Sequence, residues 1–252
     1  MVMRKEEQIR AYYYTLFQAW GPQHWWPART RFEVIVGAYL IQNTSWTNVE
    51  RALRRLRSAG LLNLRAMREV SLAKLESQIR SAGYFRQKAR RLKKFVAFLD
   101  DHYGGSLARM FALPTAKLRQ ELLGLNGVGP ETADSILLYA GQHPIFVVDA
   151  YTRQLLGRHG ILPENAPYEV VRNLCEGALG RVAAPDSLPP LKIGKQQFLV
   201  SHHPSPMSVA KRSPVAQTYN DMHGLIVQIG KHYCLKSRPR CEQCPLQRFL
   251  PA

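Results

Sequence analysis

The sequence is short of acidic residues. Its 252 residues include 18 Asp and Glu against 35 Lys and Arg, which gives a formal net charge of +17. A positive field of this size attracts polyanions. Nucleic acid is therefore the favoured partner, although a membrane-surface binder or a merely basic soluble protein would carry the same charge.

Long apolar runs are also missing. No stretch reaches the roughly 18 to 20 apolar residues that a membrane-spanning helix needs. Residues 1–10 lack the apolar run of a secretory signal peptide. We therefore expect a cytoplasmic protein with no membrane partner.

Cysteine is scarce and unevenly placed. The chain has four cysteines, at positions 175, 234, 241 and 244, and the last three lie close together near the C-terminal end. This distribution does not resemble the disulfide framework of a small secreted domain. Clustered thiols in a reducing compartment indicate a metal site instead.

Patterns typical of β-strands are nearly absent. The one β-like run, residues 145–148, is too short and isolated to build a sheet. Helical spacing dominates, and between residues 87 and 99 one apolar face is formed by Ala89, Leu92, Phe95, Val96 and Leu99. Thr47 and Glu50 have the spacing of a capping box, which predicts a helix with an inward face of Val49, Ala52, Leu53 and Leu56. We predict an all-α fold.

A glycine-rich turn joins two predicted helices in the middle of the chain. Thr115 can cap the first helix, which ends near Leu123, and Pro130 starts the second after the turn Leu125-Asn126-Gly127-Val128-Gly129. Glycines let the backbone turn sharply and approach another surface, and amide N–H groups beside a helix N-terminus suit a phosphate. An ordinary helix–helix turn is the alternative, and the positive charge of the chain favours the DNA interpretation.

Asp149 follows the second helix of this hairpin. It is placed to cap a further helix that runs to about His159, and capping alone would explain an aspartate here. A carboxylate at a helix start beside an apolar pocket can also stabilise the cationic sugar that develops as a glycosidic bond breaks, or orient water. The two roles are compatible.

Together these segments resemble a known family. LNGVGPETAD at 125–134 and VDAYTR at 148–153 are similar to the hairpin and catalytic aspartate of the endonuclease III, or helix-hairpin-helix-GPD, superfamily of DNA glycosylases. The resemblance extends from about Phe32 to Leu246. It implies a base-excision-repair DNA N-glycosylase that acts as a monomer on damaged double-stranded DNA.

The resemblance also implies roles for single residues. Gly127, Gly129 and Thr132 would bind the DNA backbone beside the lesion, and Asp149 would be the essential carboxylate. Gln42 and Tyr84 match positions that fill the gap left by the flipped base and wedge the duplex. Otherwise Gln42 could cap a turn, and Tyr84 could pack in a core.

One departure from the family pattern concerns strand nicking. The bifunctional members carry a lysine two residues after the second hairpin glycine, where this chain has Glu131. A glutamate cannot form the Schiff base that nicking requires. The resemblance therefore implies a monofunctional enzyme that uses water and leaves an abasic site.

Three tryptophans bear on the substrate. Trp25, Trp26 and Pro27 lie in an HWWP segment, and Trp46 follows in QNTSW; by themselves these aromatic side chains would more often be core residues. With the hairpin, they resemble the endonuclease III-like bacterial 3-methyladenine glycosylases, which also lack the lysine. Alkylated purines are cationic, and a cation is attracted to the face of tryptophan. This resemblance implies a base pocket formed by these residues in a bacterial, nucleoid-associated enzyme.

The cysteine cluster matches the same superfamily in part. Cys234, Cys241 and Cys244 have the spacing of three of the four ligands of its 4Fe-4S cluster, and the fourth position is Leu250. An unconventional fourth ligand, an incomplete cluster, a zinc ion or no metal all remain open. The expected role of a cluster would be structural, pinning a basic loop against DNA.

The same reasoning gives a domain plan of two helical lobes. We expect a central lobe at residues 29–145 with the hairpin at about 115–140, and a second lobe of residues 1–28 plus 146–252 with the cysteine-cluster loop at 234–244. A proline-punctuated basic stretch at about 185–214 is either a tolerated insertion or a DNA contact.

Two other functions remain open on sequence alone. One is an endonuclease III-type pyrimidine or mismatch glycosylase, with or without AP-lyase activity. The other is a non-catalytic DNA-binding protein that uses the hairpin and the basic faces. Asp149 separates the enzymes from the binding protein, because only catalysis needs its carboxylate.

Overall fold

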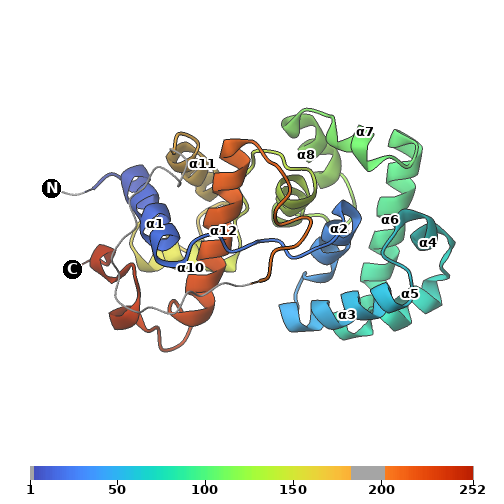
Figure 1. Ribbon diagram of the computed structural model, residues 1–252, viewed down its shortest axis with the longest axis horizontal. Coiled ribbons are helices and arrows are strands. Elements are labelled where there is room, and N and C mark those ends of the chain that lie inside the picture. Colours follow the sequence, from blue (N-terminus) through green and yellow to red (C-terminus); the bar gives the residue numbers. More distant parts are fainter. Residues whose placement is uncertain (1–2, 183–201, 252) are drawn as a thin grey trace. The chain divides into compact units, whose positions relative to one another are not determined.

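A computed structural model describes residues 3–182 and 202–251 of the chain (Figure 1). Every regular element within these two ranges is a helix, which confirms the all-α prediction. The chain divides into two compact units: unit 1 comprises Met1–Pro27 and Gln142–Ala252, and unit 2 comprises Ala28–Gly141. Most of the expected basic insertion at 185–214 lies outside the described residues.

Unit 2 contains the longer run of consecutive helices. In chain order these are α2 (Arg31–Leu40), α3 (Trp46–Ser58), α4 (Leu64–Glu69), α5 (Leu72–Gln78), η1 (Arg80–Ala82), α6 (Phe85–Tyr103), α7 (Leu107–Phe111), α8 (Thr115–Leu123), α9 (Pro130–Ser135) and η2 (Ile136–Ala140).

The core of unit 2 forms around α2 and α6. Helix α2 is apolar on most sides and, from Phe32 to Leu40, buried throughout, so it packs centrally against α3, α6 and η2. Helix α6 buries the predicted apolar face and extends beyond its predicted ends. The π-helical turn η2, which continues α9, is buried along its whole length.

Two predicted helix caps in unit 2 are wrong. Helix α3 begins at Trp46 after Ser45, so Thr47 and Glu50 do not form a capping box, and Glu50 instead accepts a hydrogen bond from Trp46 Nε1 at 2.9 Å. The inward face predicted for this helix is nevertheless buried. Thr115 is the first residue of α8 and not its cap, which is Pro114.

Unit 1 contains the helices from both ends of the chain, α1 (Lys5–Trp20), α10 (Ala150–Arg158), α11 (Tyr168–Leu179) and α12 (Pro214–His232), followed by the short turns η4 (Cys241–Gln243) and η5 (Gln247–Phe249). Helix α12 contacts the other three helices (Figure 1). It is buried from Thr218 to Gly230. In the part of the chain that the structure describes, no helix could cross a bilayer.

Two glycines let neighbouring segments approach α12 closely. A Cβ at Gly224 would lie 3.0 Å from Gln23 Cβ and 3.1 Å from Trp25 Cβ. A Cβ at Gly230 would lie 2.2 Å from the ring of Tyr151. The two glycines thus allow the tryptophan segment and the start of α10 each to pack closely against α12.

Candidate active site and DNA-contact surface

The hairpin of unit 2 is the predicted pair of helices joined by the glycine turn. Helix α8 ends at Leu123 and α9 begins at Pro130, as predicted. Arg119 of α8 and the fully buried Asp134 of α9 form an ion pair at 2.6 Å that ties the two helices together. This ion pair therefore fixes the two helices that flank the turn.

Gly127 is the position in this turn where glycine is required. Its φ of +82° lies in the left-handed region, and a Cβ there would be 2.0 Å from Nε of Arg91. Gly129 has a negative φ of −93°, and a Cβ there would meet nothing within 4 Å. The first glycine is thus needed by the fold, whereas the second leaves the exposed surface free for a ligand to approach.

Gln42 is hydrogen-bonded to this hairpin. Its Nε2 donates to the carbonyl oxygen of Gly127 at 3.0 Å and to Oγ1 of Thr132 at 2.9 Å. Its Oε1 accepts from Nη1 of Arg91 at 2.9 Å. Four residues from three parts of the sequence therefore form one network, and three of them were predicted DNA-binding residues.

Tyr84 lies in a separate exposed loop of unit 2. Its side chain is 69% exposed, so the alternative that it packs in a core is wrong. Its φ of +44° is left-handed, which is uncommon for a bulky residue. An exposed aromatic ring on a constrained turn suits a wedge that inserts into DNA.

Lys88 links the Tyr84 loop to the Gln42 loop. The side chain is buried, and Nζ donates to the carbonyl oxygens of Leu40 at 2.8 Å and Ala82 at 2.7 Å. Burial, followed by the positive charge of Arg91, lowers its pKa to about 8. These two carbonyls close the ends of α2 and η1, so one buried amine fixes the start of both loops.

Asp149 is the N-cap of α10 in unit 1, as predicted. Its Oδ1 accepts from the backbone N–H of Thr152 at 2.8 Å and from the Thr152 hydroxyl at 2.9 Å. Its Oδ2 lies 3.5 Å from Nε2 of His223, a buried residue of α12. One carboxylate oxygen is therefore used for capping, and the other faces a histidine.

The protonation of Asp149 follows from these contacts. Burial by itself raises the pKa of the carboxyl group, but the charge and hydrogen bond of His223, with the two Thr152 donors, outweigh it. The pKa is lowered, so the carboxylate stays ionised although it is only 15% exposed. A buried, ionised carboxylate is what stabilisation of a cationic transition state requires.

Trp25 and Trp26 are buried next to this pair. The Trp25 ring lies 5.9 Å from the ring of His223, 5.6 Å from that of Trp26 and 5.5 Å from that of His202. The ammonium of Lys231 lies 5.8 Å from the Trp25 ring centroid. Unit 1 thus brings two predicted pocket residues and the predicted carboxylate into one neighbourhood through His223.

The remaining predicted pocket residues lie at other places. Pro27 follows Trp26 at the end of this segment and is half-buried. Trp46 belongs to unit 2, where it opens α3. Glu131, in the position of the absent lysine, is exposed in the first turn of α9.

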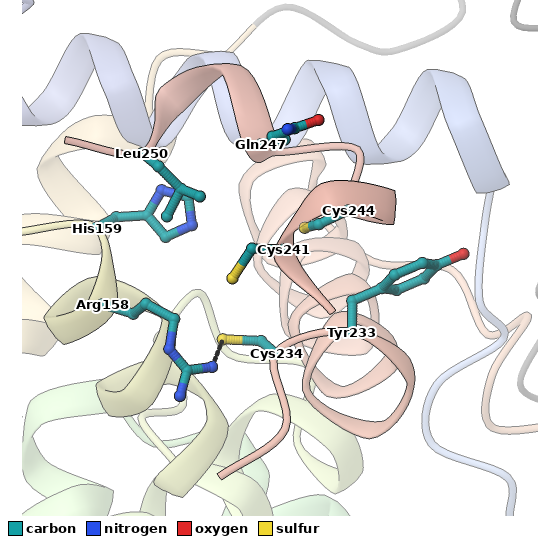
Figure 2. Close-up of a pocket in the computed structure, with 8 residues that line it drawn as sticks. All are labelled: Arg158, His159, Tyr233, Cys234, Cys241, Cys244, Gln247 and Leu250. Carbon is teal, nitrogen blue, oxygen red and sulfur yellow. Dashed lines mark hydrogen bonds between the residues drawn. The ribbon is translucent and has the colours of Figure 1, made fainter. Parts of the chain in front are cut away.

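The three C-terminal cysteines line one small pocket in unit 1, which we call the cysteine pocket (Figure 2). Its walls are Arg158, His159, Tyr233, Cys234, Cys241, Cys244, Gln247 and Leu250. Cys175 is buried in α11 and is not among these residues. The three cysteines that the sequence spacing grouped together thus line one pocket.

The thiols of this pocket suit a soft metal centre. Nη1 of Arg158 donates to Sγ of Cys234 at 3.0 Å (Figure 2). The backbone N–H of Leu246 donates to Sγ of Cys244 at 3.4 Å. Burial, with the neighbouring thiols adding to it, raises the pKa of Cys244 to about 11, although the Leu246 N–H opposes this. Metal binding would therefore release a proton from Cys244.

The donor types of the cysteine pocket can be compared with those of known metal sites. Among residues 3–182 and 202–251, no three His, Cys, Asp or Glu side chains gather closely enough to hold one metal ion. Thiolates spread around a shared pocket with N–H donors on the sulfurs are typical of iron–sulfur sites. Cys234, Cys241 and Cys244 fit three ligand positions of such a cluster.

Comparison with known proteins agrees with this geometry. The HhH-GPD superfamily base excision DNA repair protein model matches residues 36–180. The chain belongs to this superfamily. It is a DNA glycosylase, as the sequence predicted, and it contains the helix-hairpin-helix and aspartate arrangement described above.

Individual relatives extend the match over nearly the whole chain. A Methanocaldococcus jannaschii protein, provisionally named a DNA repair glycosylase, is 39% identical over 251 residues, covering 99% of this chain and 98% of the relative. Endonuclease III of Thermotoga maritima is 26% identical, covering 86% and 80%. The first of these relatives is archaeal, so a bacterial source stays a prediction.

Solved structures show the same fold. The 3-methyladenine DNA glycosylase MagIII of H. pylori, bound to 1,N6-ethenoadenine, superposes with a TM-score of 0.69 at 27% identity, covering 91% of this chain and 98% of that one. A trapped covalent complex of endonuclease III with DNA gives 0.72 at 22% identity, covering 99% and 96%. The second likeness concerns the fold alone.

Three site residues were missed by the sequence analysis: His223, Lys88 and Arg91. Each of these residues lies within a helix. From the sequence alone it is interpreted as an ordinary member of the apolar or basic face of that helix. The nearest signals were the position of Lys88 in the GYFRQKA segment that holds Tyr84, and the position of His223 within the long α12. Neither specifies a partner without tertiary structure.

Proposed function

We propose that this glycosylase excises alkylated purines such as 3-methyladenine from double-stranded DNA and that it is monofunctional. The observation that carries the proposal is the ionised, enclosed Asp149 on a chain that has Glu131 where nicking needs a lysine. A monomer on damaged duplex DNA is the working form we propose.

The proposed reaction uses few groups. As the glycosidic bond breaks, positive charge develops on the sugar, and the Asp149 carboxylate stabilises it or orients the attacking water. Oδ2 is the oxygen available for this, because Oδ1 is already held by Thr152. Glu131 offers no amine, so the product is an abasic site in an intact strand.

The tryptophans support the substrate class. A cationic purine is already a good leaving group, so stacking and one carboxylate are sufficient catalysis. Trp25 and Trp26 lie beside the His223–Asp149 pair, and MagIII, at 27% identity, is itself a 3-methyladenine glycosylase. We propose Trp25, Trp26 and Pro27 of unit 1 as base-pocket residues, and Gln42, Tyr84, Gly127, Gly129 and Thr132 of unit 2 as DNA contacts. Trp46 of unit 2 stays a separate candidate for contact with the base.

Incubation with methylated duplex DNA tests the proposal directly. We expect release of 3-methyladenine, an intact strand carrying an abasic site, and no covalent complex on borohydride treatment. Release of oxidised pyrimidines alone would contradict the substrate class. Efficient borohydride trapping would contradict monofunctionality.

A second candidate is a mismatch glycosylase that removes a neutral pyrimidine. The observation that favours it is the Lys231 ammonium 5.8 Å from the centroid of the Trp25 ring. A cation already on this ring opposes a cationic base, whereas it would stabilise a neutral base that leaves as an anion. The two candidates therefore predict opposite effects of removing one charge.

Replacing Lys231 with Met separates the candidates. If the substrate is a cationic purine, the single-turnover rate of its release should rise about two- to fivefold, which corresponds to roughly 0.5–1 kcal/mol for an exposed cation–π contact. If the substrate is a neutral pyrimidine, the rate should fall. Lys5→Met, at an exposed lysine that begins α1 in the same unit, is the matched control and should leave both rates unchanged.

Replacing His223 with Gln should move the acidic limb of the pH–rate profile to higher pH. His223 lowers the pKa of Asp149 against the effect of burial, so its loss raises that pKa. The active carboxylate form, present above its pKa, is then lost earlier as the pH falls. Single-turnover rates from acidic to neutral pH measure this shift.

A second histidine of α12 provides the control variant for the His223→Gln experiment. His232 is exposed in the last turn of the same helix, so His232→Gln should leave the acidic limb in place. An unshifted limb in His223→Gln would show that the pairing with Asp149 does not set the carboxylate's protonation.

A further inference from the structure

The cysteine pocket contains a nitrogen ligand that the sequence pattern did not suggest. His159 follows the last residue of α10, is only 6% exposed, and lines the pocket with all three cysteines (Figure 2). We propose that His159 completes the ligand set of an iron–sulfur cluster held by Cys234, Cys241 and Cys244. This inference goes beyond the proposed function and does not depend on the substrate.

The residue at the position of the family's fourth cysteine cannot bind iron. It is occupied by Leu250, which follows η5 and whose side chain lines the same pocket. A leucine side chain has no donor atom. His159 and Leu250 line the same pocket (Figure 2), and His159 Nδ1 lies 3.4 Å from the carbonyl oxygen of Phe249, the residue before Leu250. The histidine therefore contacts the segment that lacks a thiolate.

The hydrogen bonds of His159 prepare it for this role. Its Nδ1 lies 2.8 Å from the Tyr12 hydroxyl and 3.4 Å from the carbonyl oxygen of Phe249. Both oxygens can accept a hydrogen bond, so a proton on Nδ1 has partners in this position. The lone pair then lies on Nε2, and a backbone carbonyl that orients the other ring nitrogen is typical of metal-bound histidines.

The chemistry of the other pocket residues agrees. Imidazole replaces thiolate on iron in some iron–sulfur centres, where it raises the reduction potential. The sulfurs of Cys234 and Cys244 already accept N–H hydrogen bonds, which stabilise thiolates. Tyr12 is held in place by the ring of Phe249 at 5.1 Å and by Nε2 of Gln8, which donates to its hydroxyl at 2.7 Å.

A histidine ligand would connect the cluster to the catalytic helix. His159 stands at the C-terminal end of α10, and Asp149 caps its N-terminal end. From the same helix, Arg158 donates to Sγ of Cys234, and Gln154 donates to the Cys234 carbonyl oxygen. A cluster bound through His159 would thus fix the helix that carries the carboxylate, as well as the C-terminal loop.

The test is spectroscopic and uses full-length protein purified without oxygen. With 15N-labelled histidine, the reduced cluster of the wild type should show a nitrogen coupling in pulsed EPR, and it should contain about four irons per chain. His159→Ala should lose the coupling and retain about three irons. His159→Cys should restore about four irons without the coupling, and its reduction potential should be lower because thiolate is anionic.

Leu250→Cys is the matched control, because it recreates the four-cysteine spacing. It should keep the full iron content and displace the imidazole, so the nitrogen coupling disappears although His159 is intact. This variant also serves if His159→Ala does not fold. A wild-type cluster without nitrogen coupling, a single zinc ion, or no metal after reconstitution would each overturn the proposal. Base release is measured separately, so failure of the proposed substrate leaves this result unaffected.

Discussion

Replacing Asp149 with Asn should reduce the single-turnover rate of base release by about 10²- to 10³-fold, the usual cost of removing one preorganised electrostatic group. Asparagine caps a helix about as well as aspartate, so Thr152 keeps its partner at the start of α10. The variant therefore changes the charge that faces His223 and preserves the cap.

Two further measurements make this prediction specific. The thermal midpoint of Asp149→Asn should stay close to that of the wild type, and its affinity for an undamaged duplex should be unchanged. Thr152→Val, which removes one hydroxyl donor to Oδ1 but keeps the carboxylate, is the matched control and should retain most of the activity. A fully active Asp149→Asn variant would refute the assigned role of the carboxylate.

Replacing Gly127 with Ala should weaken DNA binding at least about tenfold, or about 1.4 kcal/mol. The residue has a φ of +82°, which costs an alanine about 1–2 kcal/mol. Its Cβ would also collide with Arg91, which binds Gln42. The substitution should therefore disturb the hairpin and the Gln42 network together and lower the melting temperature.

The Gly129→Ala variant distinguishes an effect on protein stability from an effect on DNA binding. Its backbone suits alanine, and the added Cβ meets nothing within 4 Å in the protein. This variant should melt like the wild type, so any loss of DNA affinity, measured by titration of a duplex, reports a close approach of the phosphate backbone. If Gly127→Ala bound DNA normally, the hairpin would not be the DNA contact we propose.

Much of the fold followed from local patterns. The apolar spacing of α6, the inward face of α3 and the ends of the hairpin helices were predicted correctly because each depends on residues a few positions apart. The capping box at Thr47 failed for a physical reason. Ser45 already ends the preceding turn, and Glu50 has a partner in Trp46.

In the candidate site, too, local features were predicted from the sequence and long-range contacts were not. Asp149 was recognised as a helix cap because capping depends on the adjacent Thr152. Its pairing with His223 was not recognised, because 74 residues separate the two in sequence and only the packing of α12 on α10 brings them together. Trp25 was likewise chosen for its type, whereas its contacts with Lys231 and His223 depend on tertiary structure.

By itself, the sequence determined the helical class, the hairpin, the DNA glycosylase family and the absence of a nicking lysine, because these depend on short motifs and on the identity of one residue. Only the tertiary structure decided which groups surround those motifs. It placed His223 on Asp149, Gln42 on the hairpin, and His159 beside the thiols and Leu250. The ionisation of Asp149, the positioning of the loops and the ligand set that we propose depend on contacts between distant segments, and helical periodicity does not encode such contacts.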